Sequence, residues 1–150
     1  MNRKTSGALI IATLIFSAPL WARRAHKMDV PTAVRMEYPN HNMVAVRCQL
    51  NGSERHYVCV IDSGASRTVI SDRVLSAEGP LVDMATANGV VHVHQREVLL
   101  TIADGLVLKS KALVEPNMTE QIDILLGQDV LRQFRSVVFD YDNQRVEFHR

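Results

Sequence analysis

The sequence predicts a mainly β protein that folds as a small closed β-barrel with one or two short helices. Its apolar residues make up 47% of the chain and are mostly aliphatic, while aromatic residues contribute 5%. This composition favours strands. The apolar runs are short, and turn signals such as Asn51-Gly52 separate them at regular intervals. A chain of 150 residues is long enough for one domain with its own core.

The charge and the cysteine content limit the possible functions. The formal net charge is +1, so the overall charge does not indicate a nucleic acid or an anionic membrane as partner. The low aromatic content also argues against a surface that stacks bases. Cys48 and Cys59 flank a predicted hairpin turn and do not have the spacing of a zinc site. A single disulfide between neighbouring strands and two buried thiols both remain open.

Residues 1–22 are predicted to be an export signal, because basic residues precede the apolar stretch Gly7–Leu20. Ala22 is a small residue at which such a signal could be cut. Basic residues follow it directly and disfavour cleavage, so an uncleaved membrane anchor through residues 7–22 is the other possibility. In either case we expect an exported protein, periplasmic or anchored to the inner membrane.

Residues 23–42 show no apolar period and are predicted to be a linker, with an extended piece near Val34–Tyr38. The folded domain is predicted to span residues 43–150 and to begin with a hairpin. Its first strand, Met43–Leu50, alternates between apolar and polar residues, and its second strand, Tyr57–Ile61, is almost wholly apolar. The Asn-Gly pair between them is a strong hairpin signal.

A short strand, Thr68–Ile70, follows the first hairpin. Ser71 can then cap a brief helical turn that runs through Leu75. A second hairpin is predicted next, from strands Leu81–Ala85 and Val90–Val98. Its tip consists of Thr86, Ala87, Asn88 and Gly89, which contains a second Asn-Gly pair.

The second strand of that hairpin is expected to continue to Ile102 and to turn at Ala103-Asp104-Gly105. Leu106–Val114 then returns as a strand. Further along, Ile122–Leu126 is apolar apart from Asp123 and reads as a buried strand.

The last part of the chain is predicted to contain a short helix and a hairpin. The helix is Gln128–Phe134, which places Val130, Leu131 and Phe134 on one face, with Asp129 as its cap. The hairpin consists of Val137–Asp140 and Arg145–His149.

An acidic residue at the end of an apolar strand is the first candidate functional residue. Asp62 follows such a strand, and Ser63, Gly64 and Ala65 come directly after it. A carboxylate placed at the end of a buried strand is costly unless it is paired or used. Taken alone, Asp-Ser-Gly also suits an ordinary turn after a strand.

Three features in order change that balance: the Asp62-Ser63-Gly64-Ala65 motif, a glycine-tipped hairpin, and the apolar stretch Ile124–Gly127 followed by a short helix. Together they resemble the retropepsin-like aspartic proteases, and more closely the small bacterial members with an N-terminal export segment. The resemblance covers roughly Met43–Phe148. It implies the acid-protease type of closed β-barrel and a hydrolase that cleaves peptide bonds.

The resemblance also implies roles for individual residues. Asp62 would be the catalytic acid, with Ser63, Gly64 and Ala65 completing its loop and the Ser63 hydroxyl bracing the two loops of a dimer. Residues 86–89 would be the tip of a flap over the substrate, and Leu126 and Gly127 would support the loop. The chain has one Asp-Ser-Gly, so the enzyme would be a homodimer with its site on the two-fold axis, acting on a polypeptide and needing no cofactor.

Other functions are compatible with some of these residues. A non-catalytic binding module could have the same fold, and the N-terminal segment alone would suit an anchored structural protein. His92 and His94 share one face of a strand, but no third metal ligand has suitable spacing, so a solvent-facing strand is the stronger interpretation. Ser63 and Ser66 lack the surrounding glycines of a serine-hydrolase elbow.

Overall fold

The computed structural model describes residues 30–39, 42–103 and 105–150. The predicted export segment lies outside these residues, so the export hypothesis stays a prediction. Residues 23–29 and 40–41 of the expected linker and Asp104 also lie outside them. Within the described ranges, no helix is both long enough and apolar enough to cross a membrane.

Strands make up about half of the described residues and the one helix has four residues, which confirms the predicted mainly β fold class. They form ten strands and one helix: β1 Thr32–Arg35, β2 Ala45–Leu50, β3 His56–Ile61, β4 Val69–Ser71, β5 Leu81–Thr86, β6 Gly89–Ile102, β7 Val107–Glu115, β8 Ile124–Leu126, α1 Gln128–Leu131, β9 Ser136–Asp140 and β10 Arg145–His149.

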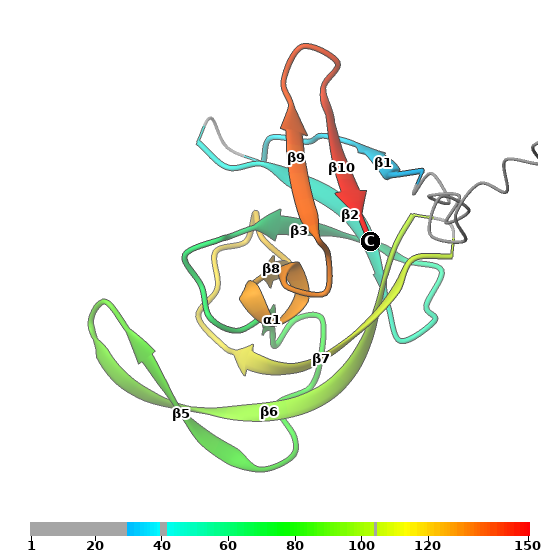
Figure 1. The fold of residues 1–150 in the computed structure, drawn as a ribbon. Coiled ribbons are helices and arrows are strands. Elements are labelled where there is room, and N and C mark those ends of the chain that lie inside the picture. The colour runs from blue at the N-terminus through cyan, green and yellow to red at the C-terminus, as the bar shows by residue number, and fades with distance from the viewer. Residues whose placement is uncertain (1–29, 40–41, 104) are drawn as a thin grey trace, which may run out of the picture.

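Seven strands form one sheet in the order β2-β3-β8-β4-β7-β6-β5. An additional pairing between β2 and β6 closes this sheet into a ring. Figure 1 shows the long curved β6 passing below β8 and α1, and the β5–β6 hairpin extending to one side of the ring. Inside the ring β3 and β8 run parallel, whereas β2 and β3 form the predicted antiparallel hairpin.

A smaller sheet of three strands, in the order β1-β10-β9, lies above the ring in Figure 1. Its buried side chains belong to the same core as those of the ring, and Phe148 of β10 packs on Phe134 with ring centroids 4.9 Å apart. Full burial of a side chain such as Phe148 contributes about 1.5 to 3 kcal/mol. The two sheets are therefore one cooperative unit.

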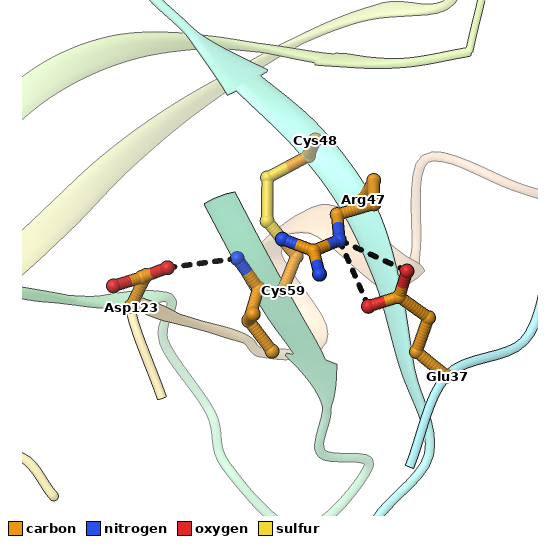
Figure 2. The surroundings of a disulfide bond; sticks show 6 residues. Glu37, Arg47, Cys48, Cys59 and Asp123 are labelled. Atoms are coloured by element: carbon orange, nitrogen blue, oxygen red, sulfur yellow. Dashed lines mark hydrogen bonds and ion pairs between the residues drawn. A yellow bond between two sulfur atoms is a disulfide. The ribbon is translucent and has the colours of Figure 1, made fainter. Parts of the chain in front are cut away.

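A disulfide joins Cys48 of β2 to Cys59 of β3, with the two Cα atoms 6.1 Å apart (Figure 2). Both cysteines are fully buried. On the same hairpin, the Arg47 guanidinium pairs with the carboxylate of Glu37 at 2.8 Å. Asp123 accepts a hydrogen bond from the Val58 amide at 2.9 Å. The disulfide therefore holds β3, the strand that leads into Asp62, against β2.

The predicted turn from Ser71 to Leu75 is present as a single turn, in which the Ser71 carbonyl accepts from Val74 and Leu75 and its hydroxyl accepts the Arg73 amide at 3.3 Å. The second predicted helical segment is shorter than expected. The predicted helix Gln128–Phe134 is helical only in α1, and bonds from Gln133 and Phe134 to residues three positions earlier continue it as turns. Bonds between residues three positions apart are common at the end of an α-helix, and here they bring the chain to the start of β9.

The segment expected to be a linker contributes a strand. β1 starts at Thr32, two residues before the expected extended piece, and pairs with β10 along its whole length. A further bridge joins Glu37 to Ala45 of β2. The folded unit thus includes residues that precede Met43. The sequence did not indicate this because the pairing partner lies more than a hundred positions away.

Candidate active site

Asp62 lies where β3 ends, at the same edge of the ring as the end of β8. Ile61 is in register with Leu126 in the parallel pair, and the Asp62 amide donates to the Leu126 carbonyl at 3.0 Å. Parallel strands that end together bring the segments that follow them side by side. The Asp-Ser-Gly loop and the Gly127-α1 segment are therefore neighbours for a topological reason.

The loop after Asp62 folds back on its own carboxylate. The Oδ1 atom accepts the amide of Gly64 at 2.8 Å and that of Ala65 at 3.2 Å. A Cβ atom at Gly64 would lie 3.2 Å from this oxygen, which is tighter than an ordinary contact. A side chain here would require the carboxylate to shift by a few tenths of an ångström, and the two amides hold this half-buried carboxylate in one orientation.

Gln128, which the sequence did not single out, ties α1 to the loop. Its backbone amide donates to the Ala65 carbonyl at 2.9 Å, and its side-chain Nε2 donates to the Ser63 carbonyl at 2.7 Å. Ser63 itself is exposed. The local signal was weak, because a glutamine after glycine suggests only the start of a helix.

Asp129 does not cap the helix as predicted, because the cap position is Gly127 and no side chain bonds there. Its Oδ1 accepts both the amide and the hydroxyl of Thr68, at 2.7 and 2.8 Å. Its Oδ2 accepts the hydroxyl of Ser110 at 2.6 Å. Hydrogen bonds to a charged acceptor are roughly twice as strong as neutral ones. Asp129 thus links α1 to the segment before β4 and to β7.

Gly127 packs directly against the backbone of the active-site loop. A Cβ atom there would lie 2.4 Å from the carbonyl carbon and oxygen of Arg67, a distance that no side chain can occupy without moving the chain. The Gly127 amide donates to the buried Thr68 hydroxyl at 3.2 Å. Leu126 and Gly127 therefore lie against this loop, and the supporting role that the resemblance implies for them stays a prediction.

The β5–β6 hairpin has the form of the expected flap. Its tip turns at Ala87 and Asn88, where the Thr86 hydroxyl accepts the Asn88 amide and donates to the Gly89 carbonyl. Val82 and Met84 are half buried on one face of β5, while Asp83 between them is exposed.

Three cavities adjoin one another at Leu125. One of about 360 Å³ contains Asp62, a second of about 580 Å³ lies under the hairpin beside Gly64 and Ala65, and a third of about 430 Å³ lies under the flap tip. Leu125 lines all three, and Met84 lines the last two, whereas no hairpin residue lines the first. The carboxylate therefore faces one part of a composite cleft whose lining is both polar and apolar.

Each of the two histidines of the β5–β6 hairpin has a hydrogen-bonding partner of its own. The Nδ1 atom of His92 lies 2.7 Å from the Asp83 carboxylate, and that of His94 lies 2.9 Å from the Gly79 carbonyl. The part of the chain that the structure describes holds no group of three or more side chains able to bind a metal ion.

The carboxylates of Asp123 and Asp129 are engaged away from Asp62. Asp123 accepts the Val58 amide, and Asp129 accepts Thr68 and Ser110. Among the described residues, Asp62 is the one acidic residue that lines its own cavity, whereas Asp83 and Glu115 line the two cavities beneath the hairpin.

We expect Asp129→Ala to lower the free energy of unfolding by about 3 kcal/mol, because it leaves the buried donors of Thr68 and Ser110 without an acceptor. Asp129→Asn should lose less, since its amide oxygen still accepts from Thr68 and its amino group can donate to the Ser110 hydroxyl. Asp142→Ala, on an exposed turn, is the control and should change stability by less than about 0.5 kcal/mol. Urea unfolding measures all three. Equal losses for the two Asp129 variants would contradict this role.

Comparison with known proteins agrees with this geometry. No curated protein matches the chain. A family model described as gag-polyprotein putative aspartyl protease matches residues 46–133, which is more than half of the sequence and includes Asp62, the flap and α1. The retropepsin-like resemblance seen in the sequence is thereby confirmed, and the chain belongs to this aspartyl protease family.

Proposed function

We propose that this protein is an aspartic endopeptidase whose active form is a homodimer with two Asp62 carboxyl groups at its centre. The observation that carries the proposal is the fixed carboxylate of Asp62, which the Gly64 and Ala65 amides hold in a cavity that shares Leu125 with the two cavities beneath the β5–β6 hairpin. Membership of an aspartyl protease family supports it.

The chemistry needs two such carboxyl groups. At about 3 Å from each other they cannot both ionise, so they share one proton. The ionised group takes a proton from a water, which attacks the scissile carbonyl carbon, while the protonated group polarises the carbonyl oxygen. The resulting tetrahedral intermediate collapses when the amide nitrogen receives a proton and leaves. An extended peptide would bind by strand-like main-chain bonds, and the flap would exclude solvent.

The surface beside Asp62 suits a second copy of the chain. Phe139 and Tyr141 border the cavity that contains Asp62. They stack with centroids 6.4 Å apart and are 36% and 60% exposed. They belong to β9 and the residue after it, and β9 pairs with β10 on one side only among the described strands. A two-fold axis through the paired Asp62 groups would bring two β9 edges and these aromatic rings together.

The direct test of the proposed activity is Asp62→Asn. The variant keeps the size of the side chain and the acceptor for the Gly64 amide, so it should fold normally. Peptide hydrolysis, followed by mass spectrometry on a mixed peptide library, should fall by roughly a thousandfold or more. Asp142→Asn serves as the matched control and should be unaffected. Turnover that survives in folded Asp62→Asn would reject the protease assignment.

The dimer surface is tested with Tyr141→Arg. Two arginines facing each other across the axis should weaken association, so sedimentation should show monomer at concentrations where the native protein is dimeric. Specific activity should then fall on dilution sooner than in the native protein. Val107→Arg, at another exposed apolar position on β7, is the control. Full activity from a monomeric Tyr141→Arg protein would contradict the shared site, and a native monomer without activity would favour a binding module.

A further inference from the structure

The cavity beneath the flap tip has walls of mixed chemistry. Met84 and Val91 of the flap cover it, and Met118, Ile122 and Leu125 form the opposite wall. Its volume of about 430 Å³ is more than enough for one large side chain. It adjoins the cleft that contains Asp62, because Leu125 lines both.

Glu115, the last residue of β7, is the one charged residue among the described residues that line this cavity. Its Oε1 atom accepts the Asn117 amide at 3.2 Å. Its Oε2 atom is buried and has no hydrogen-bond partner among the described residues. A buried acceptor of this kind is unfavourable by about 1 to 3 kcal/mol, and more when it is charged. A ligand that donates to Oε2 would remove this penalty.

A cation that contacts this wall is already engaged. Arg73 donates to the carbonyl oxygens of Met118, Thr119 and Ile122, at 2.9, 2.9 and 3.3 Å. These bonds shape the loop that forms the wall. No ion pair in the described part of the chain includes Glu115. The cavity therefore combines an apolar lining with one uncompensated carboxylate.

We propose that this cavity is a subsite for a lysine or arginine side chain of the polypeptide substrate, with Glu115 as the residue that selects it. The inference rests on the proposed function. The methylene stem of the substrate side chain packs on Met84 and Met118, and its charged head donates to the buried Oε2 of Glu115. The sites of cleavage then lie at a fixed distance from a basic residue.

The test compares kcat/KM for peptides that differ at one position, lysine against norleucine, which has the same stem without the charge. The native protein should prefer lysine by about 10-fold or more at one position relative to the cut. Glu115→Gln should reduce that preference to less than about 3-fold by weakening cleavage of the lysine peptide alone. Glu120→Gln, an exposed carboxylate in the same loop, is the matched control and should keep the preference.

Peptide binding to the Asp62→Asn protein, measured by fluorescence anisotropy, provides a readout that needs no turnover. Lysine peptides should bind more tightly than norleucine peptides, and adding Glu115→Gln should remove the difference. Cleavage without a basic preference would overturn the subsite and leave the protease assignment intact. Glu115-dependent binding without cleavage would support the subsite and reject the protease. The absence of both would overturn the two proposals together.

Discussion

The position of the Asp62 carboxylate depends on the carboxylate of Asp129. This side chain accepts three hydrogen bonds, two from Thr68 and one from Ser110, and so connects α1 to the segments before β4 and within β7. The Thr68 hydroxyl in turn accepts the Gly127 amide. Because Gly127 packs on the Arg67 backbone, the loop that carries Asp62 cannot shift without breaking this network. A buried network whose members are all satisfied fixes one arrangement of a core.

The proposed mechanism requires this rigidity. Two carboxyl groups from separate chains share a proton only if each is held within a fraction of an ångström of its position. The Asp62 loop obtains that accuracy from the parallel β3–β8 pair, from the Gly64 and Ala65 amides, and from the α1 contacts. The flap lacks such bracing at its tip, where all the residues are exposed, as suits an element that must admit a substrate.

Local patterns predicted most of the fold. Alternation and Asn-Gly turns located the hairpins, and Asn51 and Gly52 do have the positive φ values, 50° and 75°, that such a turn needs. The Asp62 motif located the loop for the same local reason. Non-local partnerships were not predictable. β1 pairs with the far end of the chain, Asp129 bonds to Thr68 before β4 and to Ser110 of β7, and Glu115 acquires its significance only from the cavity around it.

The central claim is that one active site contains an Asp62 from each of two chains, and mixing of subunits tests it most directly. Native and Asp62→Asn chains are unfolded together in varying proportions, refolded at constant total concentration, and assayed. If both carboxylates are needed, activity follows the square of the native fraction, so an equal mixture retains about a quarter of full activity. A linear fall, with about half of the activity in that mixture, would show that each chain works alone and would contradict the account.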